Sequence, residues 1–375
     1  MTTLDTTVQI AAVDLGPHLV TITWTDDSLS RFHHMWLRDN SPQAMHTTTK
    51  HRVEETSEIP DDVHPASAEL IDGDLVILWA HDGHESRYSA EWLHRFDYSR
   101  GARIERTSPI LWDASIGELV PQASYPELLA DPEVRRQYMA GFLVYGVGIL
   151  HDVPTEPGTV LKVAAEFGEV RTTSWGTVFD VRSMTDANSV AYTNLRLVTH
   201  TDEGYRNPAP TIQLQHFLVS ETSGGMATLV DGFKIAEDLR SNRPDYFELL
   251  STVLVHYHFA DATAEHENVS PIIRLDPDGS IKQIQYSNHS ATPFLVPFDQ
   301  MEAFYEAYRA FGRMRESDEY QLRINMGAGD MYMVDNHRVL HGRTSFSSGG
   351  ARHLQSCYIE RDEFASRLTV MSRNG

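Results

Sequence analysis

The closing part of the chain restricts its fold more than any other feature. His341 lies in the run MVDNHRVLHGRTSFSSGGARHLQSCY, with Arg352 eleven residues later, and far upstream stands His200-Thr201-Asp202, the only His-x-acid triplet among 19 histidines. Alternate residues of a strand point to the same face, so His200 and Asp202 can reach one ion while Thr201 points away. The fold must then bring a strand from the end of the chain to this pair, because His341 would complete the ligand set.

Two imidazoles and one carboxylate suit Fe(II) and leave three coordination positions open for oxygen chemistry. Arg352 would lie on the strand after His341, where its guanidinium can pair in a bidentate way with a carboxylate. Alone, a His-x-Asp triplet can be a surface histidine beside an acid, and a lone arginine is usually solvated. Together, the four residues favour an iron centre with an anionic co-substrate.

The first hundred residues predict a small antiparallel β domain. Alternating apolar residues indicate short strands, and the turn Asp72-Gly73-Asp74 joins two of them. The expected strands cover residues 19–24, 32–36, 68–71 and 75–79. A chain of 375 residues exceeds the roughly 250 to 300 residues at which a single core stops growing. We therefore expect two domains, residues 1–101 and 102–375.

The second domain mixes strands with helices. Helical spacing of apolar residues recurs over residues 124–146, 160–167, 233–253 and 298–314, and strand signals return at 190–192, 211–218, 227–230, 320–325, 331–334 and 353–359. Strands that frame helices in this order predict a mainly β fold with helical buttresses, in the form of a barrel or sandwich.

Composition excludes several classes of protein. The formal charge is −22, from 31 basic and 53 acidic residues, which argues against nucleic-acid binding and would attract cationic small molecules. Cys357 is the only cysteine, so neither a disulfide nor a thiolate zinc site can form within the chain. No apolar run approaches the roughly 18 residues that span a bilayer, and the first residues lack the basic start of a signal peptide. We expect a cytoplasmic protein that binds neither nucleic acid nor membranes.

Several motifs resemble those of a known family. The sequence is similar to the γ-butyrobetaine and trimethyllysine dioxygenases, 2-oxoglutarate-dependent hydroxylases of the taurine dioxygenase superfamily. The matching motifs run through nearly the whole chain: MWLRDN at 35–40, NSVAY at 188–192, HTD at 200–202, VDG at 230–232, DNHRVLHGR at 335–343, RHL at 352–354 and Tyr358. The resemblance implies a double-stranded β-helix (jelly-roll) catalytic domain behind a small N-terminal β domain, in a homodimer.

The resemblance also assigns roles to the residues around the candidate metal. It implies that His200, Asp202 and His341 ligate Fe(II) and that Arg352 binds the distal carboxylate of 2-oxoglutarate. With O2 as the second co-substrate, the implied products are an alcohol, succinate and CO2.

Four aromatic residues match the positions that hold trimethylammonium groups in these relatives. They are Trp175, Phe179, Tyr192 and Tyr358. A quaternary cation makes no conventional hydrogen bonds, but a ring face attracts it by ~0.5 to 2 kcal/mol. The alternative is that the rings fill the barrel as ordinary core; retention of all four favours a cage for a cationic substrate.

The first domain departs from the family at its zinc site. Three cysteines of the family are replaced by Ser41, Gln43 and His46, while His84 keeps the fourth position. Two imidazoles with a hydroxyl and an amide make a poor zinc site. We expect no zinc here, with hydrogen bonds holding the loop instead.

A second departure lies beside the expected substrate. Glu203 follows the metal-binding triplet where butyrobetaine hydroxylases have a tyrosine, and Ser189 replaces an asparagine. An acid would repel a substrate carboxylate unless it were protonated or paired. Tyr205, Arg206 and Asn288 could form a rearranged anion site, so the tail of the substrate could resemble that of γ-butyrobetaine or that of trimethylaminoethylphosphonate.

Three functions remain in view. The first is hydroxylation of a small quaternary-ammonium substrate with an anionic tail. The second keeps the cofactors but acts on an amino acid or secondary metabolite, with hydroxylation or desaturation as the outcome. The third is a non-catalytic betaine-binding protein, which would need no iron and is disfavoured by an intact ligand set.

Overall fold

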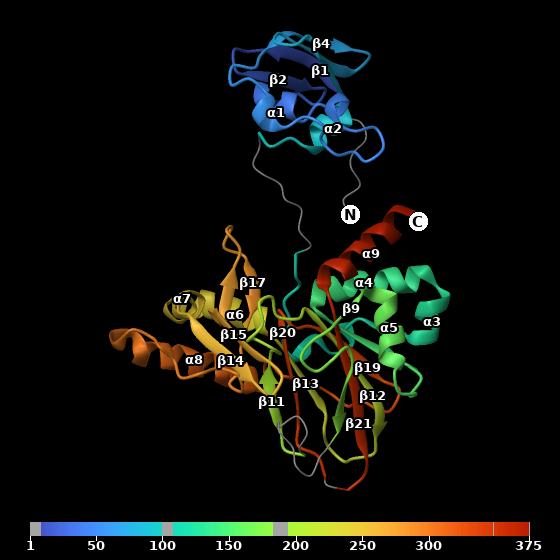
Figure 1. Ribbon diagram of the computed structural model, residues 1–375, viewed down its shortest axis with the longest axis vertical. Coiled ribbons are helices and arrows are strands. Elements are labelled where there is room, and N and C mark those ends of the chain that lie inside the picture. Colours follow the sequence, from blue (N-terminus) through green and yellow to red (C-terminus); the bar gives the residue numbers. More distant parts are fainter. Residues whose placement is uncertain (1–8, 100–107, 183–193, 348, 375) are drawn as a thin grey trace. The chain divides into compact units, whose positions relative to one another are not determined.

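The computed structural model describes residues 9–99, 108–182, 194–347 and 349–374 (Figure 1). Contacts divide the chain into two compact units, residues 1–106 and 107–375. Among the described residues, none of the helices combines the length and apolar character needed to cross a membrane.

The first unit is built from two three-stranded antiparallel sheets. One contains β1 (Ile10–Leu15), β2 (Leu19–Trp24) and β3 (Leu29–His33); the other contains β4 (Pro65–Ile71), β5 (Asp74–Trp79) and β6 (Glu85–Tyr88). Two short helices accompany them, α1 (His34–Asp39) and α2 (Ala90–Arg95). The buried faces of both sheets form one core, which includes Trp24, Phe32, Leu75 and Trp79.

The predicted strand at residues 32–36 is wrong beyond His33. Strand β3 ends at His33, and helix α1 begins at His34. The buried residues of α1 are His34, Leu37 and Arg38, which follow the helical spacing i, i+3, i+4 rather than the alternation of a strand. Helical periodicity therefore decides the conformation of this segment.

The second unit contains two sheets that face each other. The seven-stranded sheet has the order β10-β21-β12-β19-β8-β7, with β9 also paired to β21, and the four-stranded sheet has the order β11-β20-β13-β18. The strands of the larger sheet are β7 (Gln122–Ser124), β8 (Val147–His151), β9 (Val170–Arg171), β10 (Phe179–Arg182), β12 (Ile212–Ser220), β19 (Met331–Asp335) and β21 (Arg352–Ile359). Those of the smaller sheet are β11 (Leu197–His200), β13 (Ala227–Asp231), β18 (Leu322–Ile324) and β20 (Val339–Arg343).

Alternation along the strands separates the interior of this sandwich from its outer face. On β12, Ile212 and Leu214 pack outward against helices, whereas Phe217 packs inward with Leu229 of the facing sheet. The outer face of the larger sheet is covered by α3 (Tyr125–Ala130), α4 (Pro132–Tyr145), α5 (Thr159–Phe167) and α9 (Arg361–Asn374), which lie together in Figure 1. The unit is thus mainly sheet with helical buttresses, as predicted.

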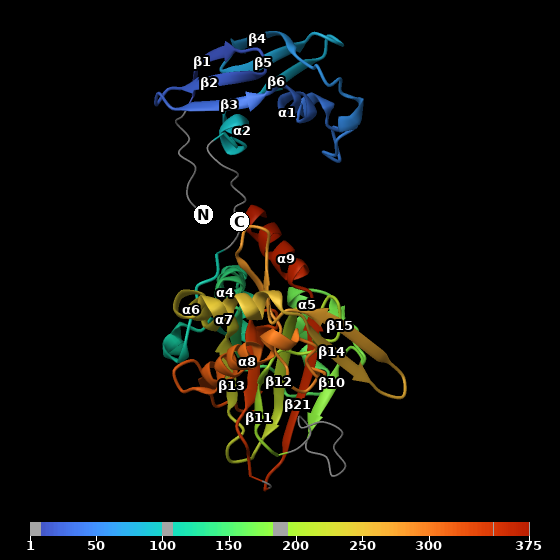
Figure 2. The ribbon, with the colours of Figure 1, turned by 90° about the vertical axis from the view of Figure 1, so that its left-hand side faces the viewer.

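A second helical layer packs beside the smaller sheet. It consists of α6 (Gly232–Asn242), α7 (Pro244–Thr252) and α8 (Met301–Glu316), which face the viewer in Figure 2. Two hairpins share its core: β14 (Val255–Ala260) with β15 (Glu265–Ser270), and β16 (Ile273–Leu275) with β17 (Ile281–Ile284). Pro244 begins α7 directly after α6, because proline suits the first turn of a helix and cannot continue one.

Candidate active site

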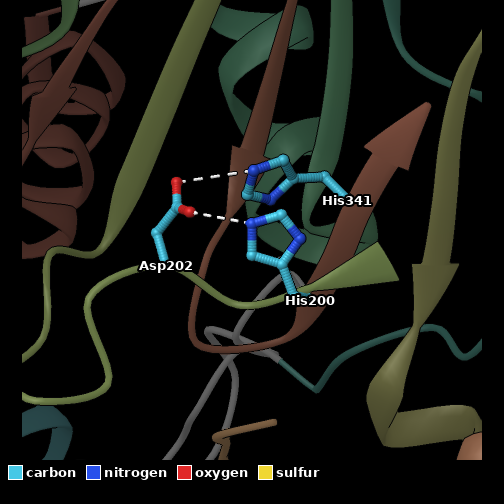
Figure 3. Close-up of side chains that lie close together, drawn as sticks. All are labelled: His200, Asp202 and His341. Atoms are coloured by element: carbon cyan, nitrogen blue, oxygen red, sulfur yellow. Dashed lines mark ion pairs between the residues drawn. The ribbon is translucent and has the colours of Figure 1, made fainter. Parts of the chain in front are cut away.

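The three predicted metal ligands come together on the smaller sheet. Strands β11 and β20 are antiparallel, and their register places His200 directly opposite His341. The two imidazole centroids are 4.9 Å apart. Asp202 follows β11, with its Oδ1 3.3 Å from Nε2 of His200 and its Oδ2 3.4 Å from Nε2 of His341 (Figure 3). One atom from each residue lies within 4.8 Å of the other two, which suits a single ion.

Gly342 allows β11 to approach β20 this closely. The register between the strands shifts between Leu197 and His200. A Cβ atom on Gly342 would lie 2.4 Å from the carbonyl oxygen of Leu197, a distance that no side chain tolerates. The glycine of the His-Gly-Arg motif is therefore required by backbone packing beside the ligands.

Neighbouring groups fix the backbone that carries these ligands. Asn336 clamps Asp202 from both sides: its Oδ1 accepts from the Asp202 N–H at 2.7 Å, and its Nδ2 donates to the Asp202 carbonyl at 3.1 Å. Thr201 is tied to Tyr286 by two hydrogen bonds of 3.0 Å. Nδ1 of His200 lies 2.9 Å from the carbonyl oxygen of Val198, which leaves Nε2 to face the other ligands.

The electrostatics of the site suit a divalent cation. Burial lowers the pKa of His341 to about 4, so its imidazole is neutral at pH 7 and offers a nitrogen lone pair. Burial opposes ionisation of Asp202, but the nearby imidazoles and the Tyr358 hydroxyl outweigh it and hold the pKa of this carboxyl well below its usual value. Two imidazoles and one carboxylate form the donor set expected for Fe(II).

The ligands line a cavity of about 430 Å³, and two arginines lie in its wall. Arg352 packs its guanidinium over the rings of Phe217 and Phe346, at 5.5 and 5.2 Å from their centroids. Arg343 lies over Phe346 at 4.9 Å, and burial together with the charge of Arg352 lowers its pKa to about 10. Two partly desolvated cations in one wall favour an anionic ligand such as a dicarboxylate.

Arg343 is a cavity residue that the sequence interpretation did not assign. It lies two residues after His341 on β20, so both side chains point to the same face of the sheet. The same periodicity that pairs His200 with Asp202 would have identified it.

Aromatic side chains line another part of the cavity wall. Phe179 and Tyr358 stack with centroids 5.6 Å apart. Trp175 lies 5.6 Å from Phe259, and Tyr205 stacks on the same ring at 4.9 Å. Phe259 was not predicted. Two predicted residues of the site, Tyr192 and Ser189, lie outside the described residues.

Glu203 lies in the cavity wall directly after Asp202. Its side chain is only 3% exposed, and neither carboxylate oxygen has a hydrogen-bond partner among the described residues. Arg206 is its nearest cation, with Nε 3.5 Å from Oε2. Burial, with a further contribution from the charge of Asp202, raises the pKa of Glu203 to about 7.

Asn288, predicted to contact the substrate, is placed elsewhere. Its Oδ1 accepts a hydrogen bond from the hydroxyl of Tyr308, and the residue borders a separate hollow. Its neighbours Ser287, His289 and Ser290 line the main cavity in its stead. The segment is a turn, so no strand or helix period indicates which of its side chains face inward.

The positions that the resemblance assigns to zinc are joined by hydrogen bonds. Ser41 Oγ lies 3.0 Å from Nε2 of His84, accepts from Ser86 Oγ at 2.8 Å and donates to Oε1 of Gln43 at 3.4 Å. His46 instead accepts from the backbone N–H of Thr49 at 3.2 Å. Hydroxyl and amide groups that are bonded to one another are poor ligands for zinc.

Comparison with known proteins follows the division into two units. Residues 111–358 match the family described as taurine catabolism dioxygenase TauD, TfdA family, and residues 13–94 match the family described as γ-butyrobetaine hydroxylase-like, N-terminal. The chain is 35% identical over 360 residues to the γ-butyrobetaine dioxygenase of Pseudomonas sp. (strain AK-1), which covers 94% of each protein. It is 32% identical over 356 residues to the mitochondrial trimethyllysine dioxygenase of Bos taurus, covering 92% of this chain and 84% of that protein.

A solved structure shares the fold. Asparagine oxygenase in complex with Fe(II), 2S,3S-3-hydroxyasparagine and succinate superposes with a TM-score of 0.50 at 17% identity, over 63% of this chain and 82% of that one. At this level of identity, the likeness is one of fold alone.

Proposed function

The chain belongs to the taurine catabolism dioxygenase TauD, TfdA family and is a dioxygenase that uses Fe(II), 2-oxoglutarate and O2; within that family, we propose that it hydroxylates a small quaternary-ammonium compound with an anionic tail. One observation carries this proposal. The His200, Asp202 and His341 ligand set opens into a cavity that also contains two buried arginines and several aromatic rings.

The ligand set fits Fe(II), and the arginines of the cavity wall would hold the co-substrate. Fe(II), when bound, supplies the chemistry that activates O2 against a C–H bond, with 2-oxoglutarate as co-substrate. His200, Asp202 and His341, which all line the cavity, would hold the ion. Arg352 would hold the distal carboxylate of 2-oxoglutarate, with Arg343 adding a second positive charge beside it.

The aromatic wall supports the choice of a cationic substrate. Trp175, Phe179 and Tyr358 line the cavity, and ring faces hold a trimethylammonium group without requiring hydrogen bonds. The names of the two relatives specify butyrobetaine and trimethyllysine, and both compounds carry such a group.

The tail of the substrate would lie against a polar wall. Ser287, His289 and Ser290 line this part of the cavity and offer hydroxyl and imidazole groups. Apart from Arg343 and Arg352, no lysine or arginine lines the cavity among the described residues. Glu203 adds an acid that Arg206 only partly offsets. We propose that Ser287, His289 and Ser290 donate to an anionic tail, which would resemble that of γ-butyrobetaine or that of trimethylaminoethylphosphonate.

Succinate formation tests the proposed substrate class. Anaerobically purified protein is mixed with Fe(II), 2-oxoglutarate, oxygen and, in turn, γ-butyrobetaine, trimethyllysine and trimethylaminoethylphosphonate. At least one should stimulate succinate release, whereas its uncharged tert-butyl isostere should not. If no trimethylammonium compound stimulates turnover, the substrate proposal fails, although slow uncoupled use of 2-oxoglutarate would still mark a dioxygenase.

Three further features remain proposals. The match of residues 13–94 to a family model of its own supports a separate N-terminal domain over residues 1–101, followed by the catalytic domain over 102–375. The homodimer rests on the family resemblance and is tested by light scattering of the purified chain. Cytoplasmic location rests on composition and is tested by fractionation of cells.

A further inference from the structure

Tyr358 contacts both the aromatic wall and the metal-ligand set. Its ring stacks on Phe179 at 5.6 Å, with an angle of 29° between the planes. Its hydroxyl donates to Oδ2 of Asp202 at 2.7 Å. The side chain is almost completely buried, at 3% exposure.

Gln213 provides a second donor to the same carboxylate oxygen. Its Nε2 lies 2.5 Å from Oδ2 of Asp202 and 3.3 Å from the Tyr358 hydroxyl. Gln213 and Tyr358 are direct partners in the antiparallel pairing of β12 with β21. Its Oε1 accepts from Nε2 of Gln215 at 3.0 Å, which fixes the orientation of the Gln213 amide.

Two donors on one oxygen determine how the carboxylate presents itself. With Oδ2 held by Tyr358 and Gln213, the carboxylate is oriented so that Oδ1 lies 3.3 Å from Nε2 of His200 and Oδ2 lies 3.4 Å from Nε2 of His341. A ligating carboxylate is commonly oriented by hydrogen bonds of this kind, and loss of such a partner weakens metal affinity by ~10 to 100-fold.

We propose that Tyr358, together with Gln213, is a positioning residue for the metal ligand Asp202, while its ring forms part of the substrate wall. The role of the ring rests on the proposed function; the role of the hydroxyl does not. The two roles are separable because phenylalanine keeps the ring and loses the hydroxyl.

The test measures metal affinity in the absence of turnover. The full chain is titrated with Mn(II), and the free ion is followed by electron paramagnetic resonance. Tyr358→Phe should raise the dissociation constant ~10 to 100-fold. Tyr138→Phe is the matched control: Tyr138 of α4 is equally buried and its hydroxyl donates to Sδ of Met333 at 3.4 Å, on the helix-covered outer face of the larger sheet. This control should stay within about twofold of the wild type.

A second variant, and a KM measurement with substrate, separate the positioning role of Tyr358 from its role in the substrate wall. Gln213→Leu should also weaken Mn(II) binding at least about tenfold, and it decides the matter if Tyr358→Phe does not fold. Mn(II) affinity within twofold of the wild type in a folded Tyr358→Phe or Gln213→Leu variant would overturn the proposal. Separately, Tyr358→Phe should retain the KM of a trimethylammonium substrate and Tyr358→Leu should raise it. Failure of that comparison alone would count against the proposed substrate, not against the positioning role.

Discussion

Two regions of the chain occupy positions where the family resemblance expects a metal, and their polar groups are used differently. In the first unit, Ser41, Gln43 and His84 are bonded to one another or to neighbouring residues. In the second unit, Nε2 of His200 and Nε2 of His341 face the carboxylate of Asp202, at 3.3 and 3.4 Å. Hydrogen bonds in the second region fix the His200 ring through its Nδ1 and the backbone of Asp202, and they leave Nε2 of His200 toward the cavity.

The difference shows what separates a metal site from a cluster of polar residues. A hydroxyl and an amide can satisfy each other without an ion, so their burial carries no demand for one. A buried carboxylate carries negative charge that a bound cation offsets. We therefore expect metal in the second region and none in the first.

Removal of the carboxylate should give the largest effect. Asp202→Ala deletes one ligand and the negative charge of the site, and we expect a loss of at least ~10³-fold in substrate-stimulated succinate formation, because a bound ion contributes several kcal/mol to such reactions. Asp245→Ala, which removes an exposed carboxylate on α7, should retain activity within about twofold. Comparable activity in both variants would contradict the assigned role.

Restoring thiolates should turn the first region into a metal site. The triple variant Ser41→Cys, Gln43→Cys, His46→Cys, with His84 retained, should bind one zinc ion per chain, because three thiolates and one imidazole form a favourable tetrahedral set. Elemental analysis after dialysis measures this. Adding His84→Ala should weaken binding. Zinc retained by the unmodified chain at these positions would refute the expected absence.

Loss of a hydrogen bond in the first region should cost stability without affecting the metal. Ser86 accepts from Nε1 of Trp79 and donates to Ser41, both at 2.8 Å and fully buried. Ser86→Ala should lower the free energy of unfolding by ~1 to 3 kcal/mol, since it leaves a buried donor unpaired. The exposed control Ser57→Ala should change it by less than about 0.5 kcal/mol. Denaturant unfolding and Mn(II) titration distinguish the two effects; weakened Mn(II) binding in Ser86→Ala would join regions that we treat as independent.

Neutralising Glu203 should have the smallest effect and should depend on the tail. Glu203→Gln keeps the size of the side chain and removes its negative charge; at pH 8, where a carboxyl with a pKa of about 7 is mostly ionised, KM for a substrate with an anionic tail should fall about tenfold, or ~1.4 kcal/mol. KM for choline, whose tail is an uncharged hydroxyl, should change little, provided that choline is turned over. An equal change for both tails would show that Glu203 acts on packing rather than on charge.

The sequence could predict most of the ligand set because strand periodicity and motif spacing encode it. His200 and Asp202 share a face by alternation, and the family motif identifies His341. Arg343 could have been found by the same alternation, two residues after His341. The helix at His34 was missed because its buried residues follow a helical period over only six residues.

Other features depend on relationships that no local pattern contains. The contact of the Tyr358 hydroxyl with Asp202 requires the register of β12 against β21. The orientation of Asn288 away from the main cavity depends on a turn, where side chains follow no period. The sequence also gives no sign that the Glu203 carboxylate is buried without a hydrogen-bond partner among the described residues.

Anaerobic absorption spectroscopy tests the central claim most directly. The full chain is titrated with Fe(II) in the presence of 2-oxoglutarate, and the visible charge-transfer band of the iron and keto-acid complex is recorded. We predict a band that saturates at one iron per chain in the wild type and in Ser86→Ala, and that is lost in Asp202→Ala. Absence of the band from the wild type, or an unchanged band in Asp202→Ala, would contradict the account.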